Sequence, residues 1–272
     1  MDERVPHNGG VSTRSLEVVA HRGASAERAE HTRGAYELAL EQGADGLECD
    51  VRVTLDGHLV CVHDRRIDRT SDGRGVVSRR TAESMAALDF TGWFRSSAGL
   101  APPTGPEGVL RLEELLGLVR DHGRAVRLFI ETKHPVRYRG LVERELARLL
   151  RRYGLAAPPV RDESAVLMMS FSAAAVRRFR AEAPGVPTVL LFEQARGALR
   201  RGVLPPWADL AGPGIRVVRR DPGLVPRIAA HGRDTYCWTV DDPRDVALCR
   251  DAGVRFVATD APATTRSHLS GS

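Results

Sequence analysis

The sequence has 272 residues, 42% of them hydrophobic and 28% charged, which suits one α/β barrel of ~250 residues with a sizeable core. No apolar run reaches the ~18 residues that span a bilayer, and Met1–Ser15 lacks an apolar signal core, so we expect a cytoplasmic protein without stable membrane insertion. The net charge is +5, but the arginines are spread along the chain without a binding module or basic–aromatic stripe, which argues against nucleic acid as a partner.

Short apolar runs alternate with longer amphipathic segments. The apolar runs predict parallel strands at Val18–His21, Gly46–Val51, Val126–Glu131, Val166–Ser170, Thr188–Phe192, Ile215–Val218, Tyr236–Val240 and Phe256–Thr259. The amphipathic segments predict helices at Thr32–Gln42, Arg111–His122, Tyr138–Tyr153, Ala173–Ala183, Pro222–His231 and Asp242–Ala252, with glycine stops after them at Gly43, Gly123, Gly154, Gly185, Gly232 and Gly253. Eight such strands predict an α/β fold, a single (β/α)8 TIM barrel. An open doubly wound sheet is the alternative, but no GxGxxG turn follows the first strand.

One segment interrupts the alternation just after the second strand. Val51–His63 reads VRVTLDGHLVCVH, and Asp-Gly between alternating apolar residues is a strong hairpin signal. With Asp56 and Gly57 as a two-residue turn, the register places Asp50 opposite His63. The hairpin is therefore predicted to leave the second barrel strand and to bring His63 back beside Asp50.

Composition also predicts the domain boundaries. We expect a disordered N-terminal tail at 1–15, a barrel domain at 16–262 and a C-terminal tail at 263–272. The loop after the second strand carries a small insertion at about 51–106, with a helical piece near Thr81–Leu88 and an aromatic pair, Trp93 and Phe94. The four cysteines form no CxxC pair, so they are expected to be small core residues at Cys49, Cys61, Cys237 and Cys249.

Polar residues at the carboxyl ends of the predicted strands are the candidates for catalysis, because barrel enzymes place catalytic groups at that rim. The first strand ends in His21 and Arg22. Glu48 and Asp50 lie two residues apart in the second strand, so they share one face, which must be the interior because their neighbours are apolar. Two inward carboxylates are costly unless neutralised, and a divalent cation is the simplest neutraliser. Oxygen ligands favour Mg²⁺ or Ca²⁺ over zinc.

Two later strands add further candidates to the same rim. Glu131 and Lys133 share a face at the end of the third predicted strand, and Glu131 supplies a third carboxylate. Lys133 is the only lysine in the chain, and a compact ammonium suits a phosphoryl oxygen. Trp238 in the seventh predicted strand is placed to form an apolar wall for the organic part of a substrate.

Each of these residues taken singly has an ordinary structural explanation. The histidines could be hydrogen-bonded strand ends, the carboxylates could pair with arginines, and Trp238 could be core packing. Their coincidence at one rim favours chemistry on an anionic ester. Arg22, Lys133 and a cation would neutralise phosphate oxygens, and two histidines would act as general base and general acid.

Seven segments, in order along nearly the whole chain, resemble the glycerophosphodiester phosphodiesterase family. They are HRGASAERAEHT (His21–Thr32), GADGLECDVRVTLDGHLVCVHD (Gly43–Asp64), RRIDRTSDGRG (Arg65–Gly75), FIETKHP (Phe129–Pro135), MSF (Met169–Phe171), CWTV (Cys237–Val240) and GVRFVATDAP (Gly253–Pro262). The resemblance implies a barrel enzyme that hydrolyses glycerophosphodiesters to sn-glycerol 3-phosphate and an alcohol. It also implies an acid/base pair, His21 and His63; ligands of one divalent cation, Glu48, Asp50 and Glu131; phosphate contacts, Arg22 and Lys133; and a pocket residue, Trp238.

The sequence departs from the family pattern at two places. Ala29-Glu30-His31-Thr32 stands where the family usually has Pro-Glu-Asn-Thr, which is expected to alter the start of the first helix. Asp241 stands where an asparagine is usual after the WTV run, which adds a negative charge near the rim. Neither departure removes a proposed catalytic group.

Three alternatives to this hydrolysis stay open at the level of sequence. A lysophospholipase D would act on single-chain lipids in the same site, with Trp93, Phe94 and the basic surface in peripheral contact with a membrane; packing of that aromatic pair onto the barrel is the favoured explanation. A non-catalytic barrel would bind a phosphodiester without consuming it. An intramolecular transfer would give a cyclic phosphate. The headgroup, the choice of Mg²⁺ or Ca²⁺ and the oligomeric state are not readable from the sequence.

Overall fold

The computed structural model describes residues 15–94 and 105–270. Within them, eight parallel strands close into a barrel and a ninth, β3, pairs antiparallel with β2. Closure comes from β1, which pairs with both β2 and β9. The strands are β1 (Glu17–His21), β2 (Gly46–Val53), β3 (Leu59–Cys61), β4 (Arg127–Thr132), β5 (Val166–Ser170), β6 (Thr188–Phe192), β7 (Leu210–Pro213), β8 (Asp234–Cys237) and β9 (Phe256–Thr259). The predicted (β/α)8 TIM barrel is confirmed.

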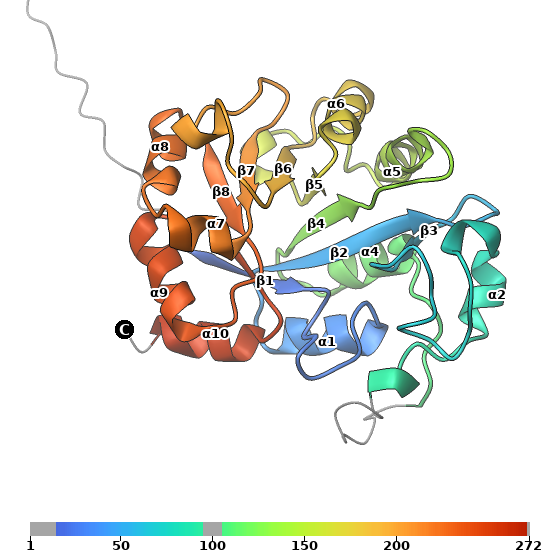
Figure 1. The fold of residues 1–272 in the computed structure, drawn as a ribbon. Helices are drawn as coiled ribbons and strands as arrows, with labels where there is room; N and C mark the ends of the chain where they lie inside the picture. The colour runs from blue at the N-terminus through green and yellow to red at the C-terminus, as the bar shows by residue number, and fades with distance from the viewer. Residues whose placement is uncertain (1–14, 95–104, 271–272) are drawn as a thin grey trace, which may run out of the picture.

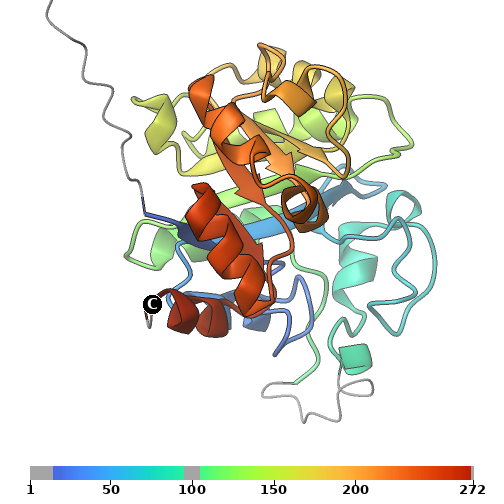
Figure 2. The same ribbon diagram turned by 60° about the vertical axis from the view of Figure 1, so that its left-hand side comes forward.

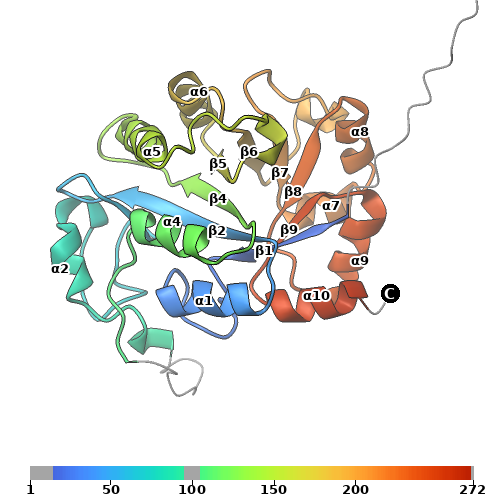
Figure 3. The same ribbon diagram turned by 180° about the vertical axis from the view of Figure 1, so that it is seen from behind.

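Helices surround the strands on the outside of the barrel (Figure 1). They are α1 (Arg33–Glu41), α2 (Ala82–Ala86), α4 (Leu112–Asp121), α5 (Leu141–Arg152), α6 (Ala173–Glu182), α7 (Ile215–Arg220), α8 (Leu224–Ala230), α9 (Pro243–Ala252) and α10 (Pro262–Ser270). Seen from behind, α4 and α5 lie on the side of the barrel that carries β2 and β4 (Figure 3). None of the helices in the described part of the chain has the length and apolar character needed to cross a bilayer.

The core has an inner and an outer layer. Inside the barrel, Phe129 stacks on Tyr236 at 5.0 Å between ring centroids and meets Phe256 edge-on at 5.1 Å. Outside, Leu47, Cys49 and other apolar residues of β2 pack against the helices. The alternation along β2 therefore turns the two carboxylates between these apolar residues toward the interior, as the sequence pattern predicts. All four cysteines are buried and unpaired by disulfides.

The insertion after β2 begins with a hairpin whose register differs by one residue from the prediction. Val51 pairs with Cys61 and Val53 with Leu59, so Asp50 lies opposite Val62 rather than His63. The reason is a three-residue loop, closed by Thr54 and His58, in which Gly57 adopts a left-handed φ of 85°. Figure 2 shows α2, which belongs to this insertion, at the flank of the barrel.

The predicted place of the sixth barrel strand is wrong. Ile215–Val218 belongs to α7, and the strand is β7, whose sequence is LAGP. Glycine and proline are rare in strands, so residue propensities do not predict this strand. A Cβ on Gly212 would meet the Leu191 side chain at 2.5 Å, so a larger residue there would force that side chain to shift. One of the six glycines predicted to end a helix also differs. Gly185 lacks the positive φ that the other five glycines adopt.

The C-terminal segment is a helix rather than the predicted disordered tail. In α10, Thr265 is buried and its hydroxyl donates to Thr259 Oγ1 at 3.0 Å. Arg266 Nη1 donates to Asp45 Oδ2 at 3.0 Å, which ties the helix to the start of β2. Leu269 packs into the outer core beside β1. These contacts order a segment whose sequence is mostly polar. The N-terminal tail predicted at 1–15 lies, except for Ser15, outside the described residues.

Candidate active site

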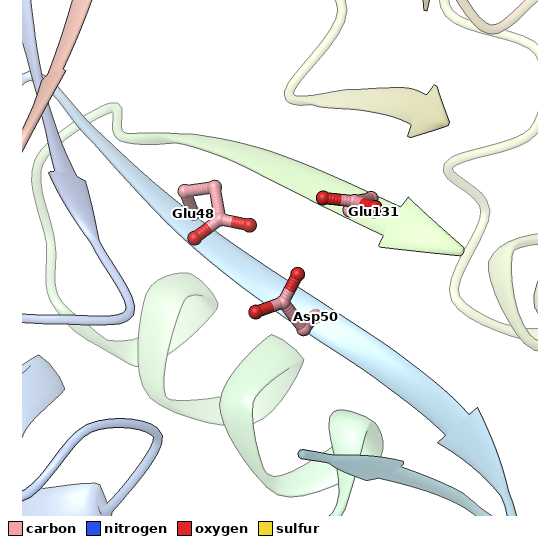
Figure 4. A group of neighbouring side chains, drawn as sticks. All are labelled: Glu48, Asp50 and Glu131. Atoms are coloured by element: carbon pink, nitrogen blue, oxygen red, sulfur yellow. The ribbon is translucent and has the colours of Figure 1, made fainter. Parts of the chain in front are cut away.

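Three carboxylates from two neighbouring strands form the centre of the site. Glu48 and Asp50 lie on β2, and Glu131 lies beside Asp50 in the register of β4. Figure 4 shows the three side chains turned toward one another. Each is buried, and one oxygen from each lies within 4.8 Å of the others. The structure thus brings together the three predicted metal ligands.

Neighbouring residues stabilise the ionised form of Asp50. Its Oδ2 lies 3.0 Å from Arg22 Nε and 2.9 Å from His31 Nε2. Lys133 Nζ lies 3.4 Å from its Oδ1. Burial opposes ionisation, but the hydrogen bond from His31 and the two nearby cations outweigh it, so the pKa of Asp50 lies well below its usual range.

At the other two carboxylates the nearby cations do not outweigh burial and the charge of Asp50. Burial and the charge of Asp50 raise the pKa of Glu48 well above its usual range and that of Glu131 to about 8. The protein residues around the triad therefore supply too little positive charge to hold three anions. An oxygen donor set with an excess of negative charge fits a hard divalent cation such as Mg²⁺ or Ca²⁺.

His31 is a residue that the sequence reasoning names only as a departure from a pattern. It is buried, and its Nε2–H donates to Asp50 because a carboxylate can only accept. Its Nδ1 lies 2.8 Å from the Tyr36 hydroxyl. Arg22 and His31 both adopt left-handed φ values, 61° and 63°, and the His31 N–H donates to the Arg22 carbonyl. Such backbone costs ~1–2 kcal/mol per residue, so the surroundings must hold this loop in place.

His21 is oriented from the far end of the chain. Its Nδ1–H donates to Asp260 Oδ1 at 2.7 Å, and Asp260 follows the last barrel strand. The Ser25 hydroxyl also donates to Asp260 at 2.9 Å. Because Nδ1 is engaged, Nε2 is the nitrogen of His21 left to meet a ligand. Sequence reasoning missed Asp260, although its position directly after a predicted strand end is a usable signal.

His63 is oriented locally by the insertion. Its Nδ1–H donates to Asp64 Oδ1 at 2.7 Å. The Arg52 guanidinium donates twice to the His63 carbonyl, at 3.0 and 2.8 Å, and so fixes the return of the hairpin. Burial and the nearby cations lower the pKa of His63, although Asp50 and Asp64 oppose this. The one-residue change in register therefore still leaves His63 at the site.

A chain of charges links the insertion to the barrel loop. Arg69 donates to both oxygens of Glu30 at 2.9 and 2.8 Å, and to Asp64 at 2.7 Å. Glu30 in turn lies 3.1 Å from Arg22. The Arg69 guanidinium also lies over the Trp93 ring, 5.7 Å from its centroid. This contact lies within the insertion, whereas the sequence predicts packing of the aromatic pair onto the barrel.

Lys133 lies at the end of β4, against the carboxylates. Its Nζ is 3.0 Å from Glu131 Oε1. Burial opposes its charge, but Asp50 and Glu131 outweigh the burial and raise the pKa of Lys133. The lysine is therefore a cation at the site.

A cavity of about 170 Å³ opens above these groups at the carboxyl ends of the strands. Seven of the eight residues predicted for the site line it, and Asp50 lies beneath it against Arg22 and Lys133. The lining residues are His21, Arg22, Glu48, His63, Glu131, Lys133, Met169, Phe171, Leu191, Glu193, Tyr236 and Trp238. The arrangement can bind an anion over a cation and offer two imidazoles to it.

Comparison with known proteins agrees with this geometry. Residues 21–264 match the sequence profile of the "Glycerophosphoryl diester phosphodiesterase family". The chain is 50% identical over 255 residues to the Mycobacterium tuberculosis protein "Probable glycerophosphodiester phosphodiesterase 1", with 93% of this chain and 92% of that protein covered. It is 32% identical to the "Glycerophosphodiester phosphodiesterase" of Bacillus subtilis, with coverage of 90% and 83%.

Solved structures give the same result for the fold. The glycerophosphodiester phosphodiesterase of Agrobacterium tumefaciens matches with a TM-score of 0.74 and 25% identity, covering 93% of this chain and all of the other. An Oleispira antarctica phosphodiesterase, solved with its product sn-glycerol-3-phosphate, matches with a TM-score of 0.76 at 22% identity, covering 93% and 96%. With a family profile matched over most of its length, the chain belongs to the glycerophosphoryl diester phosphodiesterase family of enzymes.

Proposed function

We propose that this enzyme hydrolyses glycerophosphodiesters to sn-glycerol 3-phosphate and an alcohol, with the help of one divalent cation. The observation that carries the proposal is the meeting of three buried carboxylates and two carboxylate-held histidines around one cavity. The membership of the family and the product named for the Oleispira antarctica relative support the same substrate class.

Glu48, Asp50 and Glu131 would hold the cation, Mg²⁺ or Ca²⁺. A bound cation would supply positive charge to the phosphate oxygens and lower the barrier to attack at phosphorus. The raised pKa values of Glu48 and Glu131 support this role, because both carboxylates would ionise fully once a cation is present. Arg22 and Lys133 bring two further cations to the cavity wall, where they would hold the phosphate during the reaction.

His21 and His63 would act as the acid/base pair. One Nε2 would take a proton from the attacking hydroxyl, and the other Nε2–H would give a proton to the alcohol oxygen as the P–O bond breaks. Their Nδ1–H groups are engaged by Asp260 and Asp64, which supports the required tautomer. The attacking hydroxyl is either water or the glycerol 2-hydroxyl, and the second case would give a cyclic phosphate. Trp238 would form part of the substrate pocket.

Release of glycerol 3-phosphate from glycerophosphocholine and glycerophosphoethanolamine tests the proposal. We expect turnover with Mg²⁺ or Ca²⁺, loss of turnover with a chelator, and recovery when the cation is restored. Phosphorus NMR of the early products would separate glycerol 3-phosphate from a cyclic phosphate. Folded protein that releases neither product with any of these cations would contradict the proposal.

A further inference from the structure

The two sides of the cavity differ in chemistry. In the closed ring of eight strands, β6 stands four strands from β1 in either direction, so the two strands face each other across the barrel. His21 and Arg22 lie at the end of β1, and Glu193 directly follows β6 and lines the same cavity. Glu193 therefore lies across the cavity from His21 and Arg22.

Glu193 has no role in the chemistry described above. Its side chain is exposed, and no hydrogen bond or ion pair joins it to another residue in the described ranges. A free carboxylate in the wall of an anion-binding cavity repels the phosphate and weakens binding of a purely anionic ligand. The repulsion becomes an attraction if the far end of the ligand carries a positive charge.

Two aromatic rings stand in the same wall. Phe171, just after β5, and Trp238, just after β8, meet edge to face at 5.2 Å between centroids and an angle of 84°. Trp238 Nε1 donates to the Gly212 carbonyl at 2.9 Å, which fixes the indole ring. Phe171 is 43% exposed, so much of its ring is free for a ligand. Lys133 Nζ lies 5.9 Å from the centroid of Phe171, within the range at which an aromatic ring attracts a cation.

We propose that the enzyme prefers glycerophosphodiesters whose alcohol is a cationic amino alcohol of the choline and ethanolamine class. Glu193 would attract the positive charge, Phe171 and Trp238 would enclose its alkyl groups, and the phosphate would stay with Arg22 and Lys133. Rings beside a carboxylate are the usual way to bind an ammonium group. The inference rests on the proposed function, since it assigns the alcohol arm of the substrate of that same site.

The test is a ratio of specificity constants. kcat/KM is measured for glycerophosphocholine and for glycerophosphoglycerol, whose alcohol is neutral, and the first is divided by the second. We expect a ratio well above one in the wild type, a fall of about two- to fivefold in Glu193→Gln, and a larger fall in Glu193→Lys. Phe171→Leu, which keeps apolar bulk but removes the ring, should also lower the ratio. Glu163→Gln is the control, because Glu163 is exposed and lies before β5, at the other end of the barrel.

Two outcomes would overturn the inference. A wild-type ratio near one, or a ratio unchanged in both Glu193 variants, would remove the cationic preference. In the second case, an equal loss for both substrates would assign Glu193 to the glycerol arm that they share. Calorimetry of both diesters with the His63→Ala variant gives the same ratio from binding affinities. A protein without turnover on any diester would thus refute the proposed function, while its binding ratio would still decide the inference.

Discussion

The two histidines of the site are held in the same way by two different parts of the molecule. Each donates from Nδ1 to a carboxylate oxygen at 2.7 Å. The partner of His21 is Asp260, which lies 239 residues away and arrives through closure of the barrel. The partner of His63 is its chain neighbour Asp64, which belongs to the insertion. The barrel thus builds one half of the proposed acid/base pair and the insertion builds the other.

In the proposed mechanism the insertion is therefore part of the catalytic machinery. The carboxylate triad, Arg22 and Lys133 all lie on barrel strands or directly after them, and they need no residue of the insertion to meet. His63 reaches the site only because the hairpin returns to the rim and Arg52 holds its carbonyl. Metal binding should therefore depend on the barrel alone, and proton transfer on both parts.

The largest expected effect is the loss of either histidine. His21→Ala and His63→Ala should each lower kcat by about a thousandfold, because each removes a proton-transfer group. Thermal unfolding followed by circular dichroism should show that both variants fold. His231→Ala, at an exposed helix end, should keep wild-type activity. Equal binding of the cation in wild type and His63→Ala would sharpen the division between barrel and insertion, whereas loss of cation binding in that variant would break it.

A smaller effect is expected from the carboxylates that orient the histidines. Asp260→Asn should lower kcat by about a hundredfold with little change in KM, because the amide cannot hold the Nδ1–H tautomer as firmly. Asp260→Glu should restore part of the rate if the role is orientation. Asp64→Asn provides the matching change in the insertion. Steady-state kinetics that show a loss in KM rather than kcat would assign these residues to substrate binding instead.

The smallest effect concerns the ion pairs that fasten the insertion. Burial raises the pKa of Glu30, but the hydrogen bond from Arg69 and the charges of His31 and Arg22 outweigh burial. The net effect lowers the pKa of Glu30 from 4.5 to about 2. A folded-state pKa below the unfolded one stabilises the fold above pH 4.5, and this stabilisation is lost as the pH falls toward 2. Glu30→Gln should therefore cost on the order of 2–3 kcal/mol at pH 7.

Urea unfolding between pH 7 and pH 3 measures this cost. The difference in unfolding free energy between wild type and Glu30→Gln should shrink as the pH falls. Glu163→Gln, an exposed change at a residue without an ion pair in the described part of the chain, should show no such trend. A difference that stays constant with pH would mean that Glu30 acts through packing or hydrogen bonding rather than through its charge.

Most of the barrel can be predicted from the sequence because buried parallel strands are short continuous apolar runs, and β5, β6 and β9 match their predicted bounds. The period of two along β2 is enough to place Glu48 and Asp50 on the interior face. These features depend on local patterns, which a single sequence contains.

Other features depend on residues far apart in the chain. Strand β7 is not predicted because Gly and Pro have low strand propensity. Gly212 is accommodated there because it lacks a Cβ, which would meet Leu191 on the neighbouring strand. The hairpin register depends on one loop residue, Gly57, and on the Asp56 side chain, which accepts from the Ala82 N–H of the insertion. The place of Glu193 opposite β1 follows only from closure of the ring.

The bond between His21 and Asp260 also bears on how the protein is made. Strand β1 is synthesised early, but one of its edges pairs with β9, which is among the last segments synthesised. Contacts of such long sequence separation form late and slowly. Until that strand docks, the edge of β1 is unpaired and His21 lacks its carboxylate. Completion of the active site and closure of the barrel are therefore one event, so a chain that stops before Phe256 should be both inactive and prone to aggregate.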